Sequence, residues 1–279
     1  MEVPRGNERK AMVASSELVG SALFVYMILV SKGDELAVPL ALFAVILIFG
    51  GITGGHFNPA VTIGVYIKEG KYKENLILCV LLNLAQFVGA LAGMGMATFT
   101  LSVNVNGEYQ VPESKVPILA PKDPSGVSNV EMGEGKDGFI QDWQTIFTQI
   151  VCTFIFVSIV LTVKDKFTTH SKDGALLALA VVTVLFGLIQ VANHHAASFN
   201  PCVSVALTIF QVSVLENTGG YLTHYFYAYF LGPYIGGIIA GLWQKNHPLI
   251  TDQKEQAGPA GLPPNRDDEA GLVNGAAAQ

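Results

Sequence analysis

Long apolar runs separated by short polar links dominate the chain and predict a series of membrane-spanning helices. Six spans are expected, at about residues 12–30, 36–52, 75–101, 143–163, 175–192 and 221–243. Their lengths fit the roughly 17–25 apolar residues that a helix needs to cross a bilayer. Two shorter apolar segments, which begin at Asn58 and Asn200, are too short to cross on their own.

The two shorter segments share one sequence pattern. The first reads GGHFNPAVTIGVYI around Asn58, and the second reads AASFNPCVSVALTI around Asn200. Asn is a favoured N-cap and Pro is tolerated in the first helical turn, so Asn-Pro predicts the start of a helix. About ten residues at 1.5 Å each reach about 15 Å, which is half of the hydrocarbon core. We therefore expect two half-helices that dip into the membrane.

The two halves of the chain also align outside the half-helices. Glu17 begins the stretch ELVGSA in the first span, and Gln149 begins QIVCTF in the fourth. Each half has three spans, and an odd number makes the second half start from the opposite face. The half-helices then approach each other from opposite sides near the midplane. The predicted fold is an all-α membrane bundle of six transmembrane helices and two re-entrant half-helices, with inverted repeats at residues 12–101 and 141–246.

The remaining segments are polar. Residues 1–11 form an N-terminal tail, residues 102–140 a long loop without helical period, and residues 247–279 a tail expected to be disordered. Of the 16 Lys and Arg residues, twelve lie on the side of the two termini. The positive-inside rule therefore places both tails in the cytoplasm and the long loop outside it. A full-length span follows the N-terminal tail, so no cleaved signal peptide is expected.

Composition narrows the class of protein. Of the 279 residues, 51% are hydrophobic and 14% are charged, and the mean hydropathy is +0.44. Soluble domains carry about 25% charged residues, so an integral membrane protein is indicated. No basic stripe supports nucleic-acid binding. Cys79, Cys152 and Cys202 lie in apolar segments without metal-ligand or disulfide spacing, and no nucleophile–base pair falls within the spans. We expect neither an enzyme nor a cofactor or metal.

Beyond these patterns, the chain resembles an aquaporin of the major intrinsic protein family over about residues 12–246. The stretch GGHFNPAVT around Asn58 matches the family's first box residue for residue, and the stretch around Glu17 and LGPYIGG in the last span are also similar to the family. The resemblance implies a passive channel for water and small neutral solutes such as glycerol, urea or ammonia. It also implies a homotetramer in the lipid bilayer, in the plasma membrane rather than an intracellular one.

The resemblance further implies roles for the box residues. The side-chain amides of Asn58 and Asn200 donate hydrogen bonds to a central water and so interrupt the chain of waters along which protons hop. The positive ends of the two half-helices repel cations at the same place. Glu17, Gln149 and His56 are expected to support the loops that carry the half-helices. The expected pore constriction consists of Asn58, Pro59, Ala60, Asn200, Pro201 and Cys202.

The second box departs from the family pattern. It reads Asn200-Pro201-Cys202-Val203, where family members have Asn-Pro-Ala-Arg, so the arginine of the narrowest filter is absent. Alignment to the boxes predicts an apolar selectivity filter, and we expect it to be broad. Cys202 is expected to face the constriction and to make the channel sensitive to mercury. The filter residues are Val38, Leu188, Ala197 and Val203, of which Val38 and Leu188 are placed only to within one residue.

Two other classes of protein share some of these features. A secondary transporter also has inverted repeats and broken helices, but it needs ionisable groups at the midplane, and only Glu17 is charged within the spans. A junctional or scaffolding protein that kept the fold but conducts poorly is supported only by the altered second box. Osmotic shrinkage of proteoliposomes separates the three classes, because a channel gives fast, unsaturable flux with a low activation energy.

Overall fold

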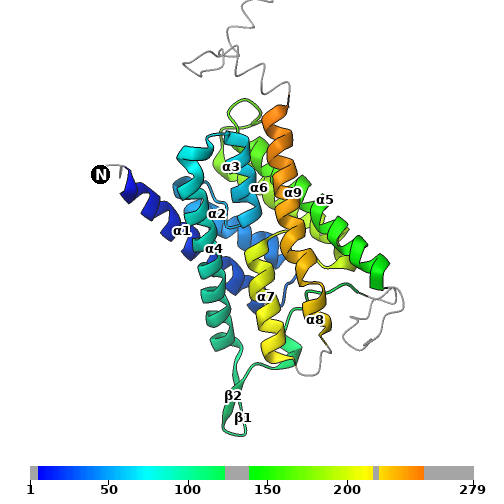
Figure 1. Cartoon of the computed structure of the whole chain (residues 1–279). Coiled ribbons are helices and arrows are strands. Elements are labelled where there is room, and N and C mark those ends of the chain that lie inside the picture. The colour runs from blue at the N-terminus through cyan, green and yellow to red at the C-terminus, as the bar shows by residue number, and fades with distance from the viewer. Residues whose placement is uncertain (1–5, 123–137, 216–219, 248–279) are drawn as a thin grey trace, which may run out of the picture.

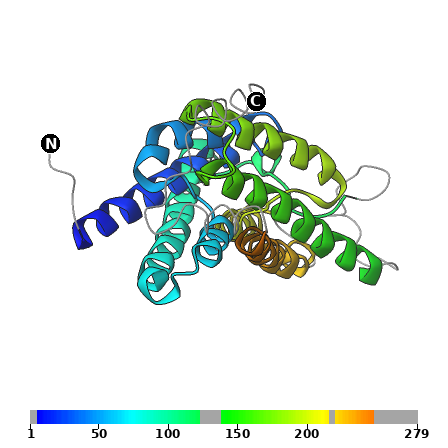
Figure 2. The same cartoon turned by 90° about the horizontal axis from the view of Figure 1, so that it is seen from above.

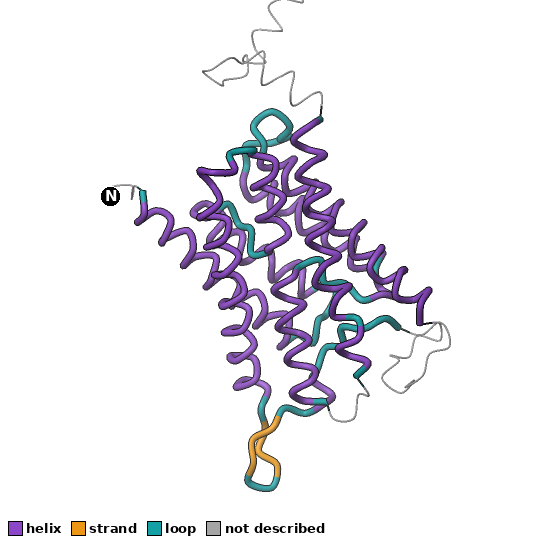
Figure 3. Tube along the Cα trace, viewed as in Figure 1, coloured by secondary structure: helices purple, strands orange, loops and turns teal. Residues whose placement is uncertain are grey.

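The computed structural model describes residues 6–122, 138–215 and 220–247. Helices make up most of the described chain and run side by side in one bundle (Figures 1 and 3). The helices are α1 (Asn7–Val30), α2 (Ala37–Thr53), α3 (Pro59–Glu69), α4 (Tyr72–Leu101), α5 (Gly138–Lys164), α6 (Gly174–Val191), α7 (Pro201–Val214), α8 (Tyr221–His224) and α9 (Phe226–Asn246).

The six expected spans correspond to α1, α2, α4, α5, α6 and the pair α8–α9. Five helical stretches in the described residues are long and apolar enough to cross a membrane, and they lie in α1, α4, α5, α6 and from Leu222 through α9. Helix α2 has 17 residues and rises about 25 Å, which suffices for a thin hydrocarbon core. Span six is interrupted at Tyr225, where α8 ends and α9 begins.

The long loop after α4 is more regular than its sequence predicted. Strands β1 (Val103–Val105) and β2 (Glu108–Gln110) form an antiparallel hairpin, and the 3-10 helix η1 (Glu113–Lys115) follows. Asn106 and Gly107, with φ of 54° and 96°, form the turn, as Asn-Gly favours in a two-residue hairpin. The expectation of an irregular loop was therefore wrong for this part. Most of the predicted C-terminal tail, and residues 1–5, lie outside the described residues.

The contacts between helices repeat in the two halves. Helix α1 packs most extensively against α4, and α5 packs in the corresponding way against α9. Both crossings depend on glycine: a Cβ atom on Gly89 or Gly93 of α4 would lie 2.2 Å from the carbonyl oxygen of Leu18 or Ala22. A Cβ atom on Gly236 of α9 would lie 2.5 Å from the carbonyl oxygen of Ile150. Such close approach needs residues without a side chain.

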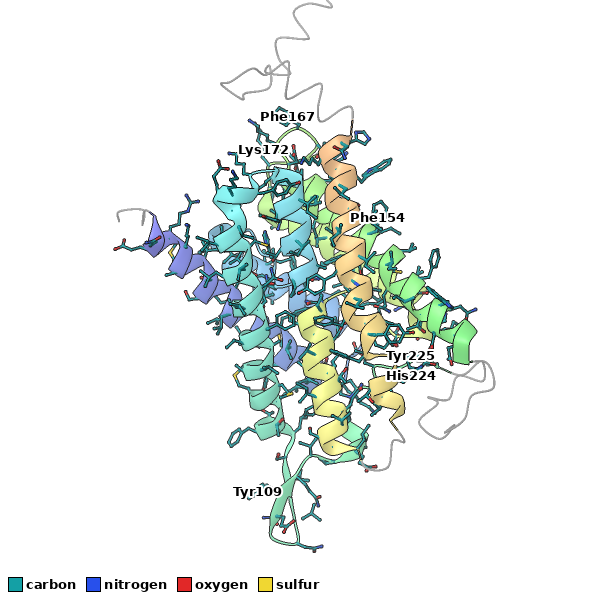
Figure 4. The ribbon with its side chains drawn as sticks, viewed as in Figure 1. Tyr109, Phe154, Phe167, Lys172, His224 and Tyr225 are labelled. Carbon is teal, nitrogen blue, oxygen red and sulfur yellow. The ribbon has the colours of Figure 1, made fainter. Side chains whose placement is uncertain are left out.

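The two half-helices lie in opposite halves of the bundle, with α3 in the upper half of Figure 1 and α7 in the lower half. Seen from above, α2 and α6 occupy one side, and α3 and α9 the other (Figure 2). Figure 4 places Phe167 and Lys172 at one end of the bundle and Tyr109 at the other. We call these the α5–α6 end (the loop 165–173) and the hairpin end (residues 103–110).

Candidate pore

Each half-helix begins at its asparagine through the same local geometry. The Asn58 side-chain oxygen accepts a hydrogen bond from Ala60 N at 2.8 Å, and the Asn200 oxygen accepts one from Cys202 N at 3.2 Å. Pro59 and Pro201 are the first helical residues of α3 and α7, so their missing N–H groups cost nothing there. These contacts fix the orientation of both amides, with each oxygen directed into its own helix.

The amide nitrogens join the two half-helices to each other. Asn58 Nδ2 donates to Phe199 O at 2.9 Å, and Asn200 Nδ2 donates to Phe57 O, also at 2.9 Å. An amide nitrogen carries two hydrogens, and each of these bonds uses one. Both asparagines line the same cavity, so the second hydrogen of each amide remains to bind a molecule inside it.

Both loops before the half-helices contain a non-glycine residue with positive φ. Phe57 has φ 44° and Phe199 has φ 51°, and such backbone persists only where its surroundings hold it. Glu17 holds the first loop: its two oxygens accept from His56 N at 2.9 Å and from Phe57 N at 2.7 Å. Gln86 Nε2 donates to the same carboxylate at 2.7 Å. Glu17 is fully buried, so three donors satisfy its charge away from water.

Gln149 occupies the corresponding position at the second loop. Its nitrogen donates to Ala196 O at 2.7 Å, and its oxygen accepts from Ser198 N and Phe199 N, both at 3.4 Å. The longer contacts are weaker than those of Glu17 because an amide oxygen carries no full charge. Gln149 therefore binds backbone groups of the second loop as Glu17 binds those of the first, but with an uncharged side chain.

Tyr229 and Gln86 also hold the loops, and the sequence analysis did not single them out as site residues. Tyr229 O–H donates to His195 O at 2.8 Å, and Tyr229 O accepts from Ser204 at 2.7 Å. An aromatic-rich last span is typical of packing and interface residues, so the sequence held no clear signal for Tyr229.

Burial and the adjacent His194 lower the pKa of His195.

A cavity of about 170 Å³ extends from the hairpin end of the bundle to the paired asparagines. Val38, Ala197 and Val203 line it, as does Ile189. Leu188 is 7% exposed, belongs to the core cluster and is not among the lining residues. Ile189 of α6 thus lines the cavity where the alignment placed Leu188, a difference of one residue. The polar mouth of the cavity includes Lys32, Glu35, Lys122 and Asn193.

The loop that follows η1 also lines this mouth. Pro117, Ile118 and Leu119 line the cavity, and Gln211 Nε2 of α7 donates to Pro117 O at 2.8 Å. Lys122 N donates to His194 O at 2.7 Å, which fixes the end of the segment near the second loop. The long loop thus folds back into the bundle and contributes part of the wall.

Cys202 is placed differently from the expected pore-facing thiol. Its side chain is fully buried, it is not among the residues that line the cavity, and its sulfur lies 3.1 Å from Asn200 Oδ1. Pro59, Ala60 and Pro201 are also buried and absent from the lining. At the second position of α7 the side chain points back along the helix and into the protein. Of the six constriction residues, Asn58 and Asn200 reach the cavity.

We expect mercury to inhibit this protein only weakly. The thiol of Cys202 has no exposed surface, and Cys79 and Cys152 are 7% and 2% exposed. Val203→Cys provides the matched control, because Val203 lines the cavity one residue further along α7. Water flux measured in liposomes with and without mercury should change several-fold more for Val203→Cys than for the unchanged chain. Equal block of both proteins would show that a native thiol is accessible.

His56 separates this cavity from a second one of about 610 Å³, because it lines both. Its Nδ1 lies 3.1 Å from Thr62 Oγ1, and its backbone N–H donates to Glu17. Arg9, Gly54 and Glu69 are among the lining residues of the second cavity. Among the described residues, no group of three His, Cys, Asp or Glu side chains is arranged to hold a metal ion.

Comparisons with known proteins agree with this geometry. The family model described as major intrinsic protein matches residues 8–244. Glycerol uptake facilitator protein-like 6 of Lactiplantibacillus plantarum is 28% identical over 235 residues, covering 81% of this chain and 93% of that protein. Aquaporin Z of Photorhabdus laumondii subsp. laumondii is 30% identical over 210 residues, covering 75% and 79%.

A solved structure has the same fold. The X-ray structure of the aquaglyceroporin from Plasmodium falciparum aligns with a TM-score of 0.63 and covers 87% of this chain and 99% of that one. Its sequence identity is 17%, so the likeness concerns the fold alone. That fold is the predicted all-α bundle with two re-entrant half-helices.

Proposed function

Because the chain belongs to the major intrinsic protein family, we propose that its pore passes water and also small neutral solutes of the size of glycerol, urea or ammonia. At the coarser level, the chain is a multi-pass integral membrane channel of a family that conducts water and small solutes, and it is not an enzyme. The proposal concerns which solutes pass and which residues select them.

The observation that carries the proposal is the pair of asparagine amides at the inner end of the apolar cavity. Asn58 and Asn200 each keep one amide hydrogen free, and both line the same space. A water between them accepts a hydrogen bond from each amide, so its own hydrogens point away along the pore. Such a water cannot relay a proton in both directions. The positive ends of α3 and α7, each about half a charge, add a barrier to cations.

The apolar ring supports passage of more than water. Val38, Ile189, Ala197 and Val203 offer no side-chain donor, and Val203 stands where the family usually has arginine. Without a fixed donor, the ring gives water no replacement for its lost hydrogen bonds and suits solutes with some apolar surface. The similarity to a glycerol uptake facilitator fits this interpretation, since that protein's name refers to glycerol.

We extend the proposal to the protein's setting. Of the twelve Lys and Arg residues that the structure describes, nine lie on the side of the α5–α6 end, which supports a cytoplasmic position for this end and an outward position for the hairpin end. Large apolar side chains such as Ile77, Leu84 and Phe99 of α4 are exposed on the bundle and suit lipid or a neighbouring copy. A homotetramer in the plasma membrane remains part of the proposal by resemblance.

Shrinkage of liposomes that contain the purified protein tests the function. We expect fast, unsaturable water flux with a low activation energy when sucrose is added outside. Re-swelling in glycerol, urea or ammonium gradients should then be faster than in empty liposomes. Absence of water flux from well-folded protein would favour the poorly conducting scaffold that the altered second box suggests. Saturable flux coupled to an ion gradient would favour a transporter.

A further inference from the structure

Lys164 is the last residue of α5, and its ammonium group lies close to Gly54. A Cβ atom placed on Gly54 would lie 4.0 Å from Lys164 Nζ and 3.7 Å from His56 Nε2, so the two side chains meet over the same glycine. His56 also lines the cavity that opens at the hairpin end. The ammonium group therefore stands beyond the inner end of that cavity, on the side of the α5–α6 loop.

Lys164 lies beside the second cavity, on the cytoplasmic side of His56. The residue is exposed to solvent, and its ammonium nitrogen approaches Gly54 and His56, which both line that cavity. We take the two observations together as placing the ammonium group at the inner end of the second cavity, on the path that leads from His56 to the cytoplasmic side.

Within the described part of the chain, Lys164 has no ion-pair or hydrogen-bond partner. The adjacent carboxylate of Asp165 lies 2.8 Å from Lys68 Nζ, and Lys68 also donates to Leu161 O at 2.8 Å. The oxygens of Glu17 are occupied by the N–H groups of the first loop. The charge of Lys164 is therefore not cancelled by direct contact.

We propose that Lys164 is a further specificity-determining residue, whose positive charge repels cations at the cytoplasmic end of the pore. The second box lacks the arginine that adds to this barrier in relatives, and Lys164 supplies a positive charge at the other end of the conduction path. Water, glycerol, urea and ammonia carry no net charge and pass it, whereas hydronium, ammonium and sodium ions are repelled. This inference rests on the proposed channel function.

The size of the effect follows from the position of the charge. A positive unit charge within about 5 Å of a narrow, partly hydrated passage lowers the concentration of a monovalent cation in that passage, relative to bulk water, on the order of tenfold. Salt screens the charge less inside the passage than on an open surface. The half-helix ends at Asn58 and Asn200 form a second barrier deeper in the membrane, so loss of Lys164 should weaken cation exclusion without abolishing it.

Replacement of the charge tests the proposal. Liposomes with Lys164→Met should retain water flux and show proton flux about tenfold higher than the unchanged protein under the same potassium diffusion potential. Lys164→Arg keeps the charge and should keep proton flux low. Lys166→Met is the matched control, because Lys166 is exposed in the adjacent loop and contacts the Phe167 ring at 4.8 Å. Unchanged proton flux in Lys164→Met, with water flux retained, would overturn the proposal.

A cysteine variant tests the same point after folding is complete. In Lys164→Cys, a positively charged methanethiosulfonate reagent should lower the raised proton flux, while a neutral reagent of similar size should not. The native thiols are buried, and the reagent-treated unchanged protein serves as the control. Equal effects of the two reagents would mean that bulk and not charge matters, which contradicts the proposal. Loss of water flux in every variant and in the unchanged protein would instead contradict the channel function itself.

Discussion

Replacing Glu17 by Leu is expected to remove most of the folded protein. The change removes the acceptor of three N–H groups, namely those of His56 N, Phe57 N and one of the two on Gln86 Nε2, the other of which donates to Thr62. Each unpaired buried group costs about 1–3 kcal/mol, and native proteins are stable by only about 5–15 kcal/mol. The strained backbone at Phe57, with φ 44°, would also lose the contact that holds it. Yield on size exclusion in detergent and the thermal unfolding midpoint measure the loss.

The matched control for this prediction is Glu17→Gln. Gln149 shows that a neutral amide can contact the corresponding loop, through one oxygen that accepts two backbone N–H groups and a nitrogen that donates to Ala196 O. We expect Glu17→Gln to fold with a reduced midpoint and to keep water flux. If Glu17→Leu folded as well as the unchanged chain and conducted normally, the loop-supporting role of Glu17 would be refuted.

The fold followed from local signals that act over a few residues. Asn-Pro predicted helix starts at Asn58 and Asn200, and α3 and α7 begin at Pro59 and Pro201. N-capping and the fixed φ of proline do not depend on the rest of the structure, which explains the agreement. The hairpin at residues 103–110 had an equally local signal in Asn106-Gly107. Helical periodicity does not detect this signal, because the dipeptide marks a turn between strands.

The orientation of individual side chains in the pore could not be predicted in the same way. Successive residues of a helix point about 100° apart, so an alignment that is uncertain by one residue cannot choose between Leu188 and Ile189. Cys202 is adjacent to the asparagine box in sequence but points into the protein, as the first turn of α7 requires. In the sequence, Lys164 only follows the predicted fourth span at residues 143–163, and it is the packing of α5 beside Gly54 that brings it near His56.

Val203→Arg is expected to convert a broad filter into a narrow one. Val203 lines the cavity together with Val38, Ile189 and Ala197, so a longer side chain there reduces the opening. Arginine also adds fixed donors, which replace the hydrogen bonds that water loses on passing the ring. We expect glycerol and urea flux to fall at least about tenfold, which corresponds to about 1.4 kcal/mol in the barrier to passage, while water flux changes little. Re-swelling rates in one batch of liposomes provide the measurement.

Val203→Leu distinguishes chemistry from size in the same filter. Leucine narrows the ring without adding a donor, so it should lower glycerol flux by size and lower water flux as well. Arginine should lower glycerol flux and keep water flux high, because only arginine compensates water for its lost partners. If the unchanged protein already excludes glycerol, urea and ammonia while passing water, the ring is selective without an arginine. The broad filter would then be wrong, and the selecting contacts would have to lie elsewhere along the cavity, for example where residues 117–119 line it.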